Sequence, residues 1–95
     1  MTIHLRFESD PRKAAINLRK HGVSFDEAVT SFYDTLAISQ ADATHSAPGD
    51  ERFVNLGMST KNRLLFVVHN DADGVIRIIS ARLATPAERK LYEEF

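Results

Sequence analysis

Arginines inside an apolar strand are the side chains of this sequence most suited to chemistry. The run from Val75 to Arg82 is otherwise rich in the β-branched and apolar residues of a buried strand. A guanidinium there must face solvent, pair with a carboxylate or bind an anion, because burying it alone is costly. Together with Arg52, which opens a neighbouring predicted strand, Arg77 and Arg82 are open to both a structural and an anion-binding interpretation.

Lys20 and His21 form a second candidate pair, at the end of the first predicted helix. Cations in the last turn complement the helix dipole, and this alone explains them. A solvent-facing histidine also titrates near neutral pH, so the pair could serve as proton carrier and charge stabiliser.

Three further residues are weaker candidates. Glu51 could form an ion pair or orient a catalytic group, and Ser80 lies between the two strand arginines. Tyr92 follows Glu88 by one helical turn, where a tyrosine more often packs than acts as an acid. We therefore treat Ser80 and Tyr92 as supporting candidates.

The spacing of Arg77 and Arg82 raises a geometric question. Alternate side chains of a regular strand point to opposite faces, so residues five apart cannot share one face. Ser80 and Arg82 would then share a face, with Arg77 opposite. A β-bulge between residues 77 and 82 would bring both arginines to one face, and we favour one here because bulges are frequent beside active sites.

The elements that must position these residues follow from local patterns. Residues 2–7 alternate as a strand, and Asp10, Pro11 and Gly22 bracket a helix over residues 11–20. Ser24 and Glu27 have capping-box spacing, and Val23 can pack on Ala28, which predicts a second helix with an apolar stripe through residue 32.

The second half of the chain predicts a sheet and a last helix. Residues 36–41 are a weak strand, and residues 42–50 form a polar loop. Residues 52–58, 63–69 and 75–84 indicate an antiparallel meander. Thr85, Pro86 and Glu88 begin a helix through residue 94, with Ala87, Leu91 and Phe95 expected to face the core. The order β-α-α-β-β-β-β-α predicts an α+β fold with helices on one face of an antiparallel sheet.

Composition limits the class of protein. Ninety-five residues, 43% apolar and 26% charged, correspond to a single domain over residues 1–95. The chain has no cysteine, no membrane-length apolar run and no signal-peptide pattern, so we expect a soluble, cytoplasmic protein without disulfides. The four histidines lack metal-ligand spacing, so we expect no metal site and no cofactor.

Charge is segregated along the chain although its net value is only −1. Residues 1–22 and 52–95 have an excess of Lys and Arg, whereas residues 23–51 contain acidic side chains and no Lys or Arg. If the two ends meet in space, they form a local positive patch suited to a small anionic target.

Specific blocks of residues carry a family resemblance over residues 7–92. They are Asp10-Pro11-x-Lys13-Ala14-Ala15-x-Asn17-Leu18-x-Lys20-His21-Gly22-Val23-Ser24-Phe25, Glu51-Arg52-Phe53, Arg77-Ile78-Ile79-Ser80-Ala81-Arg82-x-Ala84-Thr85-x-x-Glu88-Arg89 and Tyr92. In these blocks the chain resembles the BrnT family of bacterial type II toxins.

The resemblance implies a RelE-like fold and a small ribonuclease that arrests translation. It also implies a hetero-oligomer with a BrnA-like ribbon-helix-helix antitoxin, which would contact operator DNA on behalf of the pair. The family's functional positions would fall on Lys20, His21, Glu51, Arg52, Arg77 and Arg82, with Ser80 and Tyr92 in support.

Two functions from different classes fit these residues. The first is a metal-independent endoribonuclease, in which the RNA 2′-hydroxyl attacks the adjacent phosphate and arginines stabilise the transition state. DNA lacks that hydroxyl and is a poorer substrate for such a site. The second is a non-catalytic interaction module whose basic cluster binds an antitoxin or RNA without cleavage.

Overall fold

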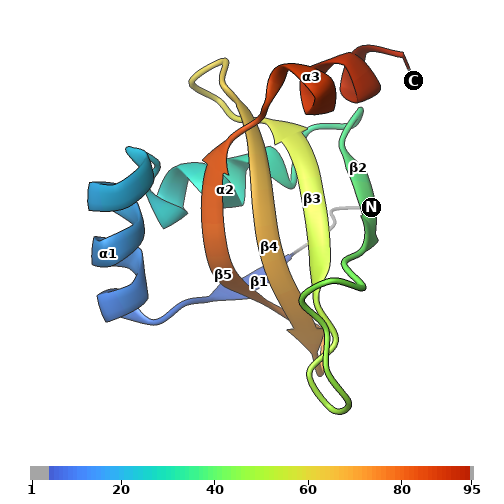
Figure 1. Ribbon diagram of the computed structural model, residues 1–95. Helices are drawn as coiled ribbons and strands as arrows, with labels where there is room; N and C mark the ends of the chain where they lie inside the picture. Colours follow the sequence, from blue (N-terminus) through green and yellow to red (C-terminus); the bar gives the residue numbers. More distant parts are fainter. Residues whose placement is uncertain (1–4, 95) are drawn as a thin grey trace.

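The computed structural model describes residues 5–94, which form one five-stranded sheet and three helices (Figure 1). The elements follow as β1 (Arg6–Glu8), α1 (Pro11–His21), α2 (Phe25–Ser31), β2 (Ile38–Ala41), β3 (Phe53–Met58), β4 (Leu64–Ala72), β5 (Val75–Leu83) and α3 (Pro86–Glu93). The fold is therefore α+β. Within residues 5–94 no helix is long and apolar enough to cross a membrane.

The sheet has the strand order β1-β5-β4-β3-β2. Strands β2 to β5 form the expected antiparallel meander, but β1 pairs with β5 in parallel, so the expectation of a wholly antiparallel sheet is wrong. A parallel pair needs a long connection between its strands, and here α1, α2 and strands β2 to β4 lie between β1 and β5 in the chain. Residues 2–4 of the first expected strand lie outside the described residues.

Local capping signals set the ends of α1. The Asp10 carboxylate accepts a hydrogen bond from the Arg12 amide at 2.8 Å, and Pro11 is the first helical residue. Gly22 ends the helix with a φ of 68°, a left-handed conformation that glycine adopts without steric cost.

Helix α2 has only half of the predicted capping box. The Ser24 hydroxyl accepts from the Glu27 amide at 3.0 Å. The Glu27 carboxylate does not return to the cap, because the Arg63 guanidinium and the Ser59 hydroxyl bind it instead. This buried network ties α2 to the β3–β4 turn, and Arg63 lowers the pKa of Glu27.

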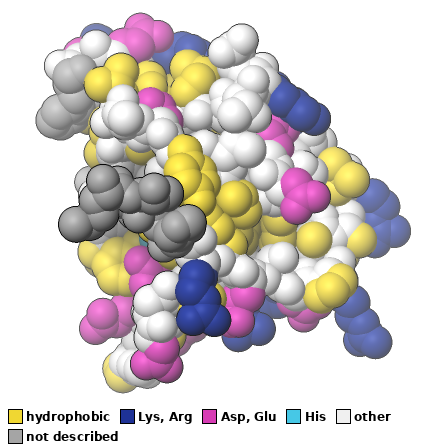
Figure 2. Space-filling view, turned by 180° about the vertical axis from the view of Figure 1, so that it is seen from behind, with side chains coloured by type: hydrophobic (Ala, Val, Ile, Leu, Met, Phe, Trp, Pro, Cys, Tyr) yellow, Lys and Arg dark blue, Asp and Glu magenta, His cyan; other side chains and the backbone are white. Residues whose placement is uncertain are grey.

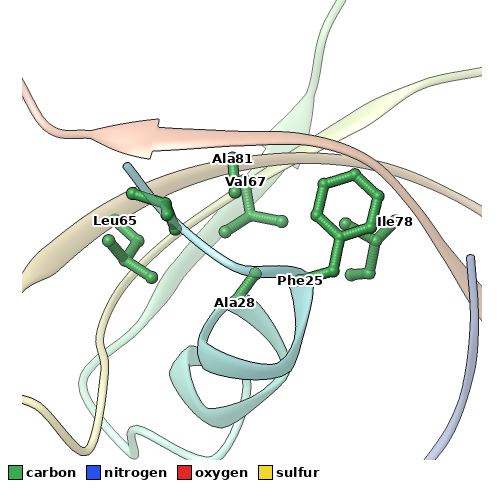
Figure 3. Close-up of a cluster of buried hydrophobic side chains, with 7 residues drawn as sticks. Phe25, Ala28, Leu65, Val67, Ile78 and Ala81 are labelled. Carbon is green, nitrogen blue, oxygen red and sulfur yellow. The ribbon is translucent and has the colours of Figure 1, made fainter. Parts of the chain in front are cut away.

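The core lies between α2 and the sheet (Figure 3). Its buried members are Val23, Phe25 and Ala28 on the helical side and Leu65, Val67, Ile78 and Ala81 on the strands. Gly57 on β3 allows the close approach of α2, because a Cβ atom there would lie 2.5 Å from the Ser31 carbonyl oxygen.

Helix α3 packs differently from the expectation. Ala87 and Leu91 are exposed rather than buried, and Phe95 lies outside the described residues. Glu88 pairs instead with Arg82, which points to the sheet face opposite the core. The expectation that all helices cover one face is therefore wrong: α1 and α2 share a side, and α3 begins on the other.

Candidate nucleic-acid interface

A single asparagine attaches α1 to the edge of β5. Asn17, only 5% exposed, donates from its side-chain amide to the carbonyl oxygens of Ala81 at 2.8 Å and Val23 at 2.9 Å. Its carbonyl oxygen accepts from the Ala81 amide at 3.1 Å. Asn17 thus replaces a neighbouring strand where β1 has ended, and it holds α1 beside β5 (Figure 1).

A β-bulge lies between the two strand arginines. Val68 is opposite Ser80 and His69 is opposite Ile78, so Ile79 is the extra residue. The prediction of a bulge between residues 77 and 82 is confirmed. Arg77 and Arg82 consequently share the sheet face opposite the core, despite their odd spacing.

Two open cavities meet along the junction of α1 and β5. The larger, about 340 Å³, is lined by Asp10, Lys13, Asp50, Arg52, Asn70, Arg77, Ile78 and Ile79. The smaller, about 180 Å³, is lined by Lys13, Ile16, Asn17, Lys20, His21, Ile79 and Ser80. We call the two together the basic groove, and Lys13 and Ile79 are the residues that line both parts.

The arginines of the larger cavity keep accessible donors. Arg77 has a side chain 54% exposed, and its nearest carboxylate oxygen, from Glu8, is 3.8 Å away. Arg52 donates from one terminal nitrogen to Asp50 at 3.2 Å, and its side chain is 30% exposed. Both guanidiniums can therefore offer further hydrogen bonds to an anion.

The polar loop over residues 42–50 positions Arg52 through its own hydrogen bonds. The Ser46 hydroxyl accepts from the Arg52 amide at 2.9 Å and donates to the Asp42 carbonyl at 2.6 Å. The Asp42 amide donates to the Arg52 carbonyl at 2.8 Å. These contacts close the loop at the start of β3 and fix the backbone from which the Arg52 side chain projects.

The smaller cavity brings together the expected proton carrier and a hydroxyl. Lys20 is exposed, and His21 and Ser80 are half-buried beside it. Seen from behind, Lys and Arg side chains lie along the side of the molecule formed by α1 (Figure 2). The two basic ends of the sequence therefore meet at this groove, although Asp10 and Asp50 temper the charge of its larger part.

Glu51 lies beside the groove rather than in it. It lines a separate open cavity of about 390 Å³ together with Glu8, Asp50, Asp71 and Arg77 among others. Arg77 thus stands between a basic and an acidic cavity. Glu51 is exposed and has no short contact with His21 or Lys20 among the interactions of the described residues.

Arg82 lies away from the groove, at the start of α3. Its two terminal nitrogens bind the two carboxylate oxygens of Glu88 at 2.8 and 2.9 Å. Its guanidinium carbon lies 3.9 Å from the centre of the Phe66 ring. The Arg82 hydrogen bond lowers the pKa of Glu88. These contacts indicate a structural tie, and a catalytic role for Arg82 stays a prediction.

Tyr92 makes the second polar contact that holds α3 to the rest of the protein. Its hydroxyl donates to the Asp34 carboxylate at 2.6 Å, and the same carboxylate oxygen accepts from the Met58 amide at 2.8 Å. The hydrogen bond to Asp34 raises the pKa of Tyr92 to about 12. A phenol that holds its proton so tightly is poorly suited to donate it at neutral pH.

Sequence reasoning missed Lys13, Asn17 and Asn70 as components of the site. Lys13 and Asn17 precede Lys20 by seven and three residues, so the helical period places all three on one side of α1, and this signal was available. Asn70 is opposite Arg77 in the register of β4 and β5, which depends on the bulge.

His69 is a buried histidine outside the groove. Its Nδ1 lies 2.6 Å from the Asp71 carboxylate, and its ring packs edge-on against Phe32 at 5.0 Å. Its side chain faces the helix side of the sheet, opposite to Arg77. Among residues 5–94 no group of three or more His, Asp or Glu side chains is arranged to hold a metal ion.

Comparisons with known proteins agree on one family. A family described as "Ribonuclease toxin, BrnT, of type II toxin-antitoxin system" matches residues 10–88. A comparison with curated protein sequences gives no match. The crystal structure of the ribonuclease toxin BrnT from Brucella abortus is similar in fold, with a TM-score of 0.64 and 20% identity. The likeness covers 86% of this chain and 99% of that one.

The family match spans α1 with its lysines, the loop before Arg52 and the whole of β5. It thus includes every described residue of the basic groove, and the fold agrees with a solved member. The chain belongs to the BrnT family of ribonuclease toxins of type II toxin–antitoxin systems.

Proposed function

We propose that this chain is an endoribonuclease toxin that cleaves RNA in the basic groove through attack of the 2′-hydroxyl. The observation that carries the proposal is the meeting of Arg52 and Arg77 with His21 and Lys20 along one groove. RNA supplies its own nucleophile, so the protein needs to move two protons and stabilise a dianionic phosphorane.

In the proposed reaction, the 2′-oxygen bonds to phosphorus, and the bond from phosphorus to the 5′-oxygen breaks. The products are a 2′,3′-cyclic phosphate and a free 5′-hydroxyl. One protein group accepts the 2′-hydroxyl proton and another donates a proton to the leaving oxygen.

His21 is the best candidate for one proton transfer. It lines the smaller cavity beside Ser80, and an imidazole can accept or donate a proton near neutral pH. Lys20 is next to it and offers positive charge. Glu51 remains a second candidate from the adjoining cavity, whereas the hydrogen bond to Asp34 makes Tyr92 the weakest.

Arg77 and Arg52 would stabilise the transition state. Their planar donor arrays match two phosphate oxygens. Losing one such preorganised donor costs about 10²- to 10³-fold in rate in comparable sites. Arg82, held by Glu88 and Phe66, would then support the sheet and α3 instead of touching substrate.

A cleavage assay tests this function. A defined RNA is incubated with the purified toxin in EDTA, and the new ends are identified by mass spectrometry. We expect fragments that end in a 2′,3′-cyclic phosphate, and we expect a single 2′-deoxy substitution at the cleavage position to abolish the cut. Binding of RNA without cleavage in all metal conditions would favour the non-catalytic interaction module instead.

The proposed partner is an antitoxin of the BrnA type with a ribbon-helix-helix domain, encoded beside the toxin. The pair would form a cytoplasmic hetero-oligomer that arrests translation only when the toxin is released, and operator DNA would be bound through the antitoxin. An acidic segment of the antitoxin would cover the basic groove, since charge complementarity speeds association. Co-purification from the native operon checks this proposal. A neighbouring product that neither binds nor relieves toxicity would contradict it.

A further inference from the structure

Lys13 occupies a central position in the basic groove. The larger cavity contains the two arginines and the smaller one contains His21 and Lys20. Lys13 and Ile79 are the described residues that line both, and of these only Lys13 carries charge. A ligand that touches both cavities must pass Lys13.

Lys13 is also an unpaired cation. Within residues 5–94 neither Lys13 nor Lys20 has a carboxylate within 4.0 Å, whereas Arg52 and Arg77 each have one at 3.2 and 3.8 Å. Asp10 and Asp50 line the same cavity as Lys13 without forming an ion pair with it. The Lys13 ammonium is therefore free to bind an incoming anion.

The direction of Lys13 is set by the docking of α1. Asn17 lies one turn further along the helix, and its buried amide is bound to both backbone groups of Ala81. Residues four apart lie on the same side of a helix, so this lock turns Lys13 toward β5. The Lys13 side chain is exposed, and together with Ile79 it lines both cavities.

We infer that Lys13 is a catalytic residue that contacts the scissile phosphate above Ile79; this inference rests on the proposed ribonuclease function. The scissile phosphate must be within reach of Arg77 for charge stabilisation and of His21 for proton transfer, and these residues line different cavities. Lys13 and Ile79 line both cavities, so the place where the cavities adjoin lies between Arg77 and His21. There the Lys13 ammonium binds a non-bridging oxygen and gains strength as the dianion develops.

A pair of uncleavable RNAs tests the contact directly. Both carry a 2′-deoxy sugar at the mapped cleavage position, and one also has an uncharged methylphosphonate in place of the scissile phosphate. Affinity is measured for the wild type, Lys13→Gln, Lys13→Arg and the control Arg12→Gln. Arg12 has the same charge in the same helical turn, and it lines neither cavity.

We expect Lys13→Gln to weaken binding of the phosphodiester RNA by about 5- to 10-fold and to lower its salt slope by roughly one. The same variant should leave binding of the methylphosphonate RNA unchanged, because the charge it contacts is already absent. Lys13→Arg should keep most of the affinity, and Arg12→Gln all of it. With normal RNA, Lys13→Gln should lower kcat by about 10²-fold.

Two results would overturn the inference. Equal losses on both RNAs would mean that Lys13 contacts a different phosphate, and no loss on either would mean that it contacts none. A wild-type protein that binds RNA but never cleaves it would overturn the proposed ribonuclease function, and with it the assignment of a scissile phosphate. Either of the two results above, obtained with a toxin that cleaves RNA, would overturn the role of Lys13 alone.

Discussion

The two ends of β5 use the same residue type in opposite ways. Arg77 and Arg82 lie on one strand and, through the bulge at Ile79, on one face. Arg77 is 54% exposed with a carboxylate oxygen no nearer than 3.8 Å. Arg82 is 35% exposed, binds both oxygens of Glu88 and lies over Phe66. Partners, more than residue type or strand position, therefore separate an available cation from a structural one.

The difference arises from the helix that lies beside each arginine. Glu88 occupies the third position of α3, where the Thr85 amide also binds its carboxylate at 2.8 Å. This capping box holds Glu88 toward Arg82. Beside the part of β5 that lines the groove, α1 presents Lys13 and Lys20, and among residues 5–94 neither lysine has a carboxylate within 4.0 Å.

Replacing Arg77 should produce the largest effect on function. Arg77→Ala is expected to lower the cleavage rate by about 10²- to 10³-fold, because it removes a transition-state donor, and to leave the melting temperature nearly unchanged. Single-turnover cleavage and thermal unfolding measure the two quantities. Arg19→Ala is the control, because Arg19 has the same charge as Arg77, is exposed and lines neither part of the groove.

Replacing Asn17 should weaken the attachment of α1 to β5 without removing a charged group. Asn17→Ala leaves both backbone groups of Ala81 unsatisfied, so we expect a loss of roughly 2–3 kcal/mol in the free energy of unfolding. Denaturant titration measures this loss. Ser39→Ala, which removes one partly buried hydrogen bond to Asn55, should cost only about 1 kcal/mol. A similar cost for both variants would contradict the role given to Asn17.

Replacing Arg82 should affect stability more than rate. Arg82→Ala breaks a partly exposed ion pair and a cation–π contact, for which we expect a loss of about 1 kcal/mol in the free energy of unfolding. Glu88→Gln should show a smaller loss, and the two losses should add only in part in the double variant, because both remove the ion pair and only Arg82→Ala removes the contact with Phe66. A rate loss as large as that of Arg77→Ala, at temperatures where the variant is folded, would restore the prediction that both arginines are catalytic.

The smallest expected effect is the pH dependence of the stability that the hydrogen bond from Tyr92 to Asp34 contributes. The folded-state pKa of Tyr92 is raised from 10.0 to about 12, so its stabilising contribution is complete below pH 10 and is lost as the pH rises toward 12. Burial of Asp34 opposes ionisation, but hydrogen bonds from Tyr92 and two backbone amides outweigh it and lower its pKa below 3.8. The contribution of Asp34 is therefore complete above that value and is lost only in stronger acid.

A single comparison measures this contribution. The difference in melting temperature between wild type and Tyr92→Phe should be present at pH 7 and should shrink at pH 11. A difference that stays constant across this range would show that the hydroxyl contributes nothing through Asp34.

Local signals in the sequence predicted most elements but not their relative placement. Asp10, Ser24 and Thr85 cap the helices as expected, because a cap depends only on residues within one turn. The parallel pairing of β1 with β5 depends on contacts about 70 residues apart in the chain. The sequence of α3 has an amphipathic pattern that favours burial of Leu91. In the structure Leu91 is exposed, and polar contacts of Glu88 and Tyr92 hold the helix in place.

The residues of the candidate site could be predicted from the sequence, but their exact placement could not. Residue type and motif singled out Lys20, His21, Arg52 and Arg77, which line the groove. The bulge could be proposed from spacing alone, but its position at Ile79 follows from the packing of Ile78 and Ala81 into the core. The pairing of Arg82 with Glu88 could not be read from the sequence, because it requires the turn between β5 and α3 to direct the helix back over the strand.

Mapping the RNA contact residue by residue tests the central claim, that RNA binds in the basic groove and not at the α3 end. Backbone amide signals of the isotope-labelled protein are followed by nuclear magnetic resonance as a 2′-deoxy-blocked RNA is added. We expect the largest shifts at Lys13, His21, Ile79 and Ser80, with little change over residues 85–93. Shifts concentrated around Arg82 and residues 85–93, with residues 11–21 unchanged, would contradict it.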